Sequence, residues 1–257
     1  MFATERQRRI LEHLRAHGRA SVRDLATAVD CSEVTIRRDL LMLGQQGLVD
    51  RSRGGAAFPL ADHTATLQPQ EVHGQPSVLA DLAAELVKDG ETIALGAGTT
   101  IAKLAARLAD KVDLTVVTNS LLVGDALAAS NVHVVMTGGS LRGSTMSLVG
   151  GGAERIFSEL GVRRAFLSGD GLTSTWGLSA ADAESASVER AIAAASEEVV
   201  VLAEGGTVGV DAMTLTVPCA RISDVVTDEQ ADPEVLEGLR ANGVRVHTAT
   251  LLKADQR

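Results

Sequence analysis

The sequence predicts a small helical domain followed by a larger α/β domain with a mostly parallel, Rossmann-like sheet. Apolar residues recur at helical spacing within the first 45 residues. From residue 77 onward, short β-branched runs alternate with alanine-rich stretches, as in strands connected by crossover helices. The chain has 257 residues, of which 45% are hydrophobic, and this is enough to form two separate cores.

Three short helices are expected in the first domain. The first runs from about 4 to 17 and ends before Gly18, a residue type that favours helix C-termini. The second begins at Ser21, with Asp24 in the acidic third position, and the third begins at Ser32. Their inward apolar residues are Ile10, Leu11 and Leu14, then Val22, Leu25 and Val29, then Ile36, Leu40 and Leu43.

The third helix turns short polar and basic side chains outward, and a basic loop at 50–55 follows it. Arginine binds guanine edges or phosphates, and hydroxyl groups reach either. A solvated face would also explain two adjacent arginines, but the order of three helices and a basic loop favours an all-α, winged helix-turn-helix domain that binds double-stranded DNA. The residues expected to contact DNA are Ser32, Thr35, Arg37, Arg38, Arg51 and Arg53.

Charge divides unevenly along the chain. Residues 1–58 contain ten arginines and seven acidic residues, a net charge of +3, whereas the remainder carries 14 basic and 26 acidic residues. An acidic remainder repels the phosphate backbone. Only the first domain is therefore expected to face DNA, and salt should weaken the binding strongly.

The domain boundaries follow from composition. We expect a DNA-binding domain at 1–58, a linker at 59–76 that is rich in Pro, Thr, Gln and His, and an α/β domain at 77–257. Cys31 and Cys219 have neither metal-ligand nor disulfide-framework spacing, so no metal and no cofactor are expected. The absence of a signal sequence or a membrane-spanning apolar run predicts a cytoplasmic protein without a membrane partner.

Seven strands and five helices are expected in the second domain. The strands are predicted at 92–95, 114–118, 132–137, 164–168, 198–203, 223–227 and 244–247, and the helices at 78–88, 100–109, 120–129, 183–196 and 233–242. Glycine-rich or polar loops follow five of these strands, at 96–100, 118–120, 137–139, 168–171 and 204–206. The carboxyl ends of parallel strands share one edge of the sheet, where ligands bind in open α/β sheets.

Two other interpretations of these loops were weighed. A dinucleotide fingerprint would need glycine at the position of Ile101 and a lone acidic residue further on, and the sequence has neither. Tight turns alone would explain any one loop. Five such loops on one edge are better explained by a binding site.

Together these motifs resemble the DeoR family of bacterial transcription regulators along nearly the whole chain. The matching stretches are SEVTIRRDL at 32–40, GGA at 54–56, GTT at 98–100, LTVVTNS at 114–120, TGGSLR at 137–142, SLVG at 147–150, AFL at 165–167 and DG at 170–171. The resemblance implies a winged helix-turn-helix joined to an effector-sensing and oligomerisation domain at 77–257, which is similar to sugar-phosphate isomerases. It also implies a repressor that assembles as a dimer or tetramer and is relieved by a phosphorylated sugar or a related metabolite.

The same resemblance implies an effector pocket. Gly96, Gly98, Thr99 and Thr100 would form an anion cradle, and Asn119, Gly138, Gly139 and Asp170 would line the sugar side. These roles suit the chemistry, since amides and hydroxyls bind phosphate oxygens, whereas Asn and Asp bind sugar hydroxyls.

The sequence departs from the family at three positions where lysine is common, namely Pro76, Glu189 and Thr207. A neutral or acidic residue there removes a charge-assisted hydrogen bond of about 1.5–3 kcal/mol to a phosphate. Either the effector is less anionic than a sugar phosphate, or the 96–100 loop holds a phosphate mainly by itself. Replaceable surface lysines would be a simpler explanation.

Two other functions stay open. The second domain could serve only for oligomerisation, with no ligand. An isomerase-like enzyme would need a positioned base, but His133 and His247 fall within predicted strands away from the glycine loops. Asp170 and Glu204 could equally accept hydrogen bonds from hydroxyls or cap loops, so we expect a regulator and not an enzyme.

Overall fold

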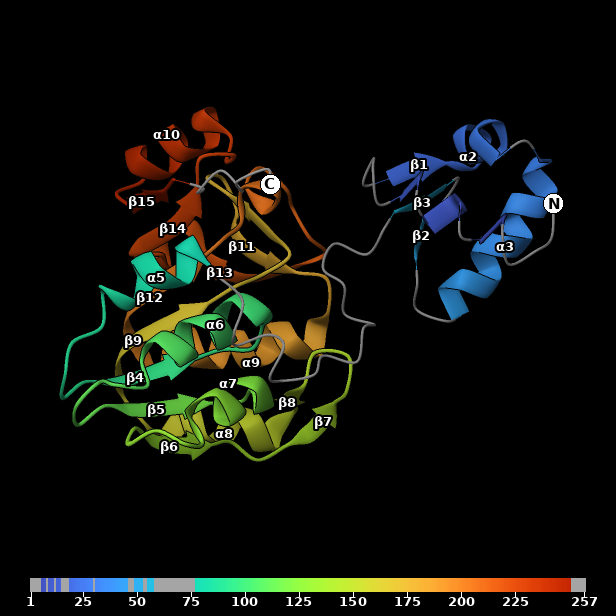
Figure 1. Cartoon of the computed structure of the whole chain (residues 1–257). Coiled ribbons are helices and arrows are strands. Elements are labelled where there is room, and N and C mark those ends of the chain that lie inside the picture. The colour runs from blue at the N-terminus through green and yellow to red at the C-terminus, as the bar shows by residue number, and fades with distance from the viewer. Residues whose placement is uncertain are drawn as a thin grey trace, which may run out of the picture. The chain divides into compact units, whose positions relative to one another are not determined.

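The computed structural model describes residues 6–7, 9–11, 13–14, 19–29, 31–45, 49–52, 55–57 and 77–250. They belong to two compact units, Met1–Leu67 and Gln68–Arg257 (Figure 1). The linker expected at 59–76, with Pro76 at its end, lies outside the described residues, and so does Arg53. Each unit is described by itself.

The first unit combines helices with a small antiparallel sheet. The described residues between 6 and 14 are helical, and then come β1 (Arg19–Ser21), α2 (Val22–Val29), α3 (Glu33–Gln45), β2 (Asp50–Ser52) and β3 (Gly55–Ala57). The strand order is β1-β3-β2. The β2–β3 hairpin forms the expected wing, whereas the strand at 19–21 was not predicted because it spans three residues.

A buried acidic residue on α3 fastens the first helical segment to it. Asp39 is 4% exposed and accepts hydrogen bonds from the Arg6 guanidinium and, at 3.3 Å, from Gln7 Nε2. The apolar face of α3 is buried as predicted, with Ile36, Leu40 and Leu43 at most 2% exposed. The ion pair and this apolar face together determine which side of α3 is exposed.

The second unit is built on a parallel sheet of seven strands in the order β15-β14-β12-β9-β4-β5-β6. The bounds are β4 (Thr92–Leu95), β5 (Thr115–Thr118), β6 (His133–Met136), β9 (Val162–Leu167), β12 (Ser196–Leu202), β14 (Asp224–Asp228) and β15 (Arg245–Ala249). All seven predicted strands are confirmed to within two residues. The prediction of a mostly parallel sheet is likewise confirmed.

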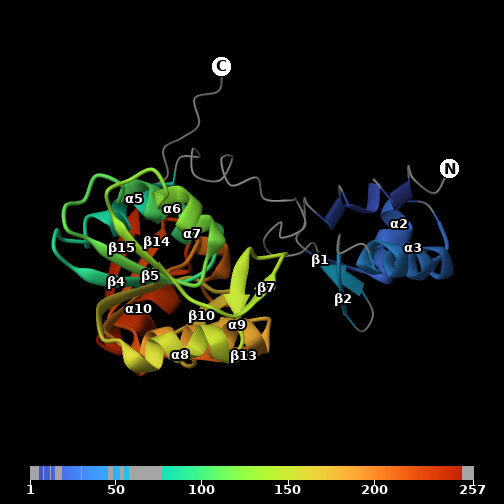
Figure 2. The ribbon, with the colours of Figure 1, turned by 90° about the horizontal axis from the view of Figure 1, so that it is seen from below.

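Helices cover both faces of this sheet. Figure 2 shows α5 (Val78–Ala84), α6 (Thr99–Arg107) and α7 (Leu121–Leu127) on one side, and α8 (Gly151–Glu159), α9 (Ala183–Ala194) and α10 (Pro233–Ala241) on the other. The N-caps of α5, α7, α9 and α10 are Ser77, Ser120, Asp182 and Asp232, whose side chains accept backbone N–H groups. By contrast, α6 and α8 begin after glycines, Gly98 and Gly150.

Several short elements were missed by the sequence analysis. They are the hairpin of β7 (Ser140–Arg142) and β8 (Ser147–Val149), the helix α8, and a second sheet of β10 (Gly171–Thr173), β11 (Gly177–Ala180) and β13 (Thr214–Pro218). Two single 3-10 turns, Gly205–Thr207 and Cys219–Arg221, were also missed. These strands are rich in Gly, Ser and Thr and are too short to show alternation.

The strand order changes direction between β4 and β9. After β4, the chain adds β5 and β6 on one side, and after β9 it adds β12, β14 and β15 on the other. β4 and β9 are themselves neighbours, with Leu95 paired to Phe166. In open α/β sheets, the crevice for ligands lies beyond the carboxyl ends of the strands at such a switch point.

Candidate functional site

The outward face of α3 carries the residues expected to bind DNA. Ser32 caps the helix, since its Oγ accepts the Thr35 N–H at 3.3 Å and lies 2.9 Å from Thr35 Oγ1. Arg37 and Arg38 are exposed on the same helix. Arg37 makes an ion pair with Glu33 at 2.8 Å, an exposed i,i+4 contact that a phosphate could replace at little cost.

Val34 is a member of this face that the sequence analysis overlooked. Its side chain is 74% exposed, and it precedes Arg37 and Arg38 by one helical turn. An apolar side chain that is this exposed is not stabilised by burial in the protein core. It suits the methyl group of thymine, which is the apolar feature of the major groove. The signal was available in the sequence, because Val34 lies off the stripe formed by Ile36 and Leu40.

The wing residues are only partly described. Arg51 lies in β2, and its side chain, like the whole of Arg53, lies outside what the structure describes. Their contacts with phosphates therefore stay predictions.

The loop after β4 leads into α6 through two glycines. Gly98 is the N-cap with φ +127°, and a Cβ there would lie 2.6 Å from Ser168 Oγ. Its Cβ-free backbone thus lets this loop approach the loop after β9. Gly98 has no side chain that could cap α6, so it leaves the first N–H groups of the helix uncapped, as in helix termini that bind anions.

The threonines of this loop differ in their surroundings. Thr99 is half-buried, whereas Thr100 is buried and its Oγ1 donates a hydrogen bond to Glu204 Oε1 at 3.3 Å. Glu204 itself is exposed and follows β12. A carboxylate therefore sits beside the N-terminus of α6.

Asn119 and Thr137 follow the next two strands. Asn119 is 4% exposed, and its Nδ2 donates to Leu148 O at 3.0 Å. Asn119 Oδ1 and Thr137 Oγ1 are both buried, and neither has a hydrogen-bond partner among the described residues. Buried polar atoms in native proteins are almost always paired, so these two indicate a water or a ligand.

Gly138 and Gly139 have a packing role that the sequence did not show. A Cβ on Gly139 would lie 2.6 Å from Val149 O, its φ is +122°, and Gly138 packs on Gly152. Close backbone packing and a positive φ account for Gly139, whereas a Cβ on Gly138 would make only an ordinary contact at 3.7 Å. Their contact with a ligand therefore stays a prediction.

Asp170 closes the loop after β9. Its Oδ2 accepts the Ala181 N–H at 2.7 Å, and its own N–H donates to Ser179 O at 2.9 Å. One carboxylate oxygen is thus used to hold the loop. This arrangement fits both interpretations of Asp170, as a loop cap and as an acceptor for hydroxyls.

Two charged residues join this edge from outside the predicted set. Arg142 on β7 bridges Asp182 at 3.2 Å and Glu184 at 2.6 Å, and its buried Nε has no partner among the described residues. Glu189 on α9 is partly buried as a residue, but its Oε2 is fully buried and likewise without a partner there. Burial, with the nearby charge of Asp170, raises the pKa of Glu189 to about 8, although a hydrogen bond with Thr216 opposes the rise.

The eight residues predicted for the effector lie on loops that follow β4, β5, β6 and β9, at one edge of the sheet. The loops after β4 and β9 touch through Gly98 and Ser168, whose Oγ donates to Ala97 O at 3.3 Å. The loops after β5 and β6 join them through the pairing of Thr118 with Leu95 and Met136.

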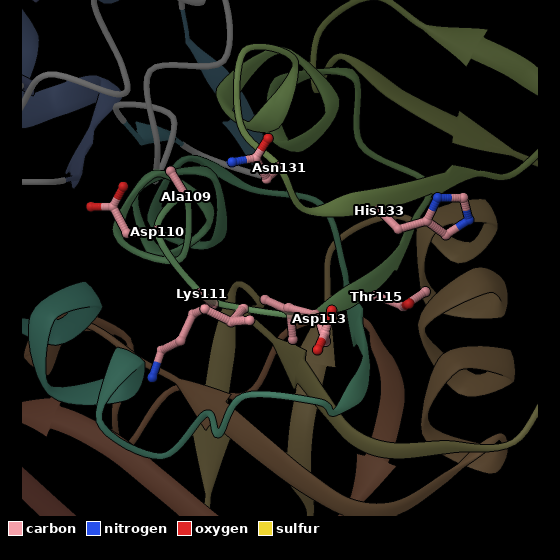
Figure 3. A pocket seen from close by; sticks show the side chains of 9 residues that line it. Ala109, Asp110, Lys111, Asp113, Thr115, Asn131 and His133 are labelled. Carbon is pink, nitrogen blue, oxygen red and sulfur yellow. The ribbon is translucent and has the colours of Figure 1, made fainter.

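A hollow of about 510 Å³ lies at the opposite edge of the sheet, before β5 and β6 (Figure 3). Asp110, Lys111, Asp113, Asn131 and His133 line part of it. None of the eight predicted effector residues borders it. We therefore assign no effector to this hollow.

Among the described residues, none of the helices has the length and hydropathy that a membrane span requires. In the same residues, no three His, Cys, Asp or Glu side chains come together in a way that could hold a metal ion.

Comparisons with known proteins agree with the two-part architecture. Residues 6–61 match the model of the DeoR-like helix-turn-helix domain, and residues 74–229 match that of the DeoR C-terminal sensor domain. The chain is 34% identical to the uncharacterised HTH-type transcriptional regulator YgbI of Escherichia coli (strain K12), covering 89% of this chain and 91% of that protein. It is 29% identical to the HTH-type transcriptional repressor GlcR of Bacillus subtilis (strain 168), covering 96% of both.

A solved structure, ribose 5-phosphate isomerase A from Neisseria gonorrhoeae, matches 57% of this chain and 56% of that one, with 21% identity and a TM-score of 0.39. The relatives are named as transcriptional regulators. The two domain matches and the relatives that extend along nearly the whole sequence lead to one conclusion: the chain belongs to the DeoR family of transcriptional regulators.

Proposed function

We propose that this protein represses genes of sugar or carbohydrate metabolism, and that a metabolite bound at the carboxyl edge of the seven-stranded sheet releases it from operator DNA. The observation that carries the proposal is a set of buried polar atoms that have no hydrogen-bond partner among the described residues. Asn119 Oδ1, Thr137 Oγ1, Arg142 Nε and Glu189 Oε2 belong to it. A bound polyol would supply the missing donors and acceptors.

The position of the site supports the same proposal. The loops after β4 and β9 lie at the switch point of the strand order, and Gly98 lets them approach closely. The effector would contact Gly96, Gly98, Thr99, Thr100, Asn119, Gly138, Gly139 and Asp170.

In the DNA-binding unit, we assign Thr35 and Arg38 to base edges, with Val34 beside them for a thymine methyl group. Ser32, Arg37, Arg51 and Arg53 are assigned to phosphates. The protein would act as a dimer or tetramer in the cytoplasm. An effector that prefers one arrangement of the sensor domains would then change the spacing between paired DNA-binding units.

An enzymatic function is less well supported. His133 begins β6 at the opposite edge of the sheet, and His247 lies in β15, 2.8 Å from Asp224. Neither could serve as a base at the carboxyl edge. We therefore propose binding without turnover.

Fluorescence anisotropy tests the proposal on the duplex that flanks this protein's own gene. We expect tight, salt-sensitive binding that one compound from a panel of sugars, sugar acids and sugar phosphates releases. Binding that no compound changes would favour the alternative, a second domain that only oligomerises.

A further inference from the structure

Acidic side chains surround the proposed effector site on several sides. Glu204 follows β12 and contacts Thr100 at the start of α6, Asp170 follows β9, and Glu189 lies on α9 near Asp170. A phosphate dianion needs cations or many free N–H groups around it. The charges at this edge of the sheet therefore influence whether an anionic or an uncharged ligand binds.

Glu204 stands where an anion would otherwise bind. It accepts the hydroxyl hydrogen of Thr100, the second residue of α6, and a carboxylate there already interacts favourably with the positive end of the helix dipole. A phosphate held by the same helix N-terminus would meet this like charge. Glu204 would instead accept a hydrogen bond from an uncharged ligand hydroxyl or a protonated amine.

Two further carboxyl groups, those of Asp170 and Glu189, lie near each other. Asp170 keeps one oxygen on Ala181 N, and Glu189 presents a buried oxygen, Oε2, with no donor among the described residues. The charges that act on Glu189 are those of Asp170 and Asp182, which oppose its ionisation, and that of Arg190, which favours it. Arg190 also donates a hydrogen bond to Leu215 O at 2.8 Å.

The cations near this edge do not offset these carboxylates. Arg142 already binds both Asp182 and Glu184. Most of the charge of Arg142 is therefore already paired. Lys103 lies one helical turn after Thr99 on α6, nearer the start of that helix than Arg107.

We propose that the effector is an uncharged or positively charged polyol, such as a free sugar or an amino sugar, and that Glu204 and Asp170 discriminate against its phosphorylated form. This inference rests on the proposed function, since it concerns the same site. Asn119 is the independent sign of a ligand, because the residue is 96% buried yet its Oδ1 lacks a partner among the described residues beside the paired ends of β4 and β5.

The test uses the full chain and isothermal titration calorimetry at fixed ionic strength and pH 7. The probes are ribose, glucose and glucosamine, their 5- or 6-phosphates, and inorganic phosphate. The variants are Glu204→Gln and Lys103→Gln, and Glu159→Gln is the control, because Glu159 is an exposed glutamate at the far end of α8. All three changes are on partly or fully exposed side chains, so folding should persist.

We expect any of these sugars that binds to bind more tightly than its phosphate. In Glu204→Gln, the affinity for inorganic phosphate should rise roughly fivefold, as expected when one nearby like charge is removed from a solvated site. Glu159→Gln should leave that affinity unchanged, and Lys103→Gln should lower it, because it removes a positive charge from α6.

The proposal is overturned if a phosphorylated probe binds more tightly than its parent sugar to the unmodified protein. It is also overturned if Glu204→Gln binds phosphate no better than the unmodified protein. Failure of the proposed function would look different. In that case operator affinity would respond to no compound, even though Glu204→Gln gained phosphate binding.

Discussion

At the scale of the residue, Glu189 makes the stability of the sensor domain depend on pH. Its pKa is raised from 4.5 to about 8 by burial and by Asp170, so between these values the folded chain keeps a proton that the unfolded chain has lost. The contribution of Glu189 to the free energy of unfolding is largest below pH 4.5. It falls as the pH rises toward 8 and is constant above that. The loss is about 1.4 kcal/mol for each unit by which the pKa is raised.

Glu189→Gln should remove this loss, because glutamine stays neutral. As the pH rises, the free energy of unfolding of the variant should increase relative to that of the unmodified protein, by a few kcal/mol at pH 8.5. Thermal or urea denaturation from pH 5 to 9 measures it, with Glu159→Gln as the control. Parallel pH profiles for Glu189→Gln and the unmodified protein would show that Glu189 ionises normally.

Arg38 and Arg37 are adjacent but should affect DNA binding differently. Arg38→Ala should cost about 1–3 kcal/mol on the operator and relax the preference at one base pair. Arg37→Ala should weaken all sequences alike, since its partner would be a phosphate. Competition binding with single-base operator variants separates the two, and equal losses across all sequences for both variants would disprove the assignment.

At the scale of the element, the start of α6 depends on glycine. Gly98→Ala places a Cβ 2.6 Å from Ser168 Oγ at a φ of +127°. We expect a loss of roughly 1–3 kcal/mol and a displaced loop between β4 and α6. Ligand binding should weaken with it.

The control is Gly151→Ala at the start of α8, where a Cβ would meet nothing within 4 Å and φ is not positive. Alanine there should leave stability unchanged or raise it by up to about 1 kcal/mol. Chemical denaturation compares the two variants. An equal effect at both positions would show that the contact with Ser168 does not matter.

The elements also show how far the sequence could predict this fold. The central strands were predictable because a parallel strand covered on both faces reads as a continuous β-branched run, as in Thr115–Thr118. β7 and β10 have no such signal, since each spans three residues and includes Ser, Gly or Thr. Their existence depends on partners that only the folded chain provides.

The site was predictable to the same extent. The loops after the strands could be placed at one edge, because parallel strands share a direction. The contact of Thr100 with Glu204 joins residues that are 104 positions apart, and no local sequence pattern predicts it. The packing of Gly139 on Val149 is equally hidden, although the glycine itself was noticed.

At the scale of the whole molecule, the uneven charge should govern DNA binding. The chain has a formal net charge of −9, yet its first 58 residues are basic. Operator affinity should fall steeply with salt, with a slope in log K against log [salt] of about −0.9 for each phosphate contacted. Anisotropy titrations over a series of NaCl concentrations measure the slope, and a flat response would contradict binding through α3 and the wing.

The change of direction in the strand order has a consequence for folding. β4, β5 and β6 are neighbours in sequence and in space, and so are β9, β12, β14 and β15. The pairing of β4 with β9 is thus a seam between two halves that are each continuous in the chain. A metabolite that contacts both halves would stabilise the pairing of β4 with β9. It should therefore slow hydrogen exchange most along these two strands and least at the outer strands.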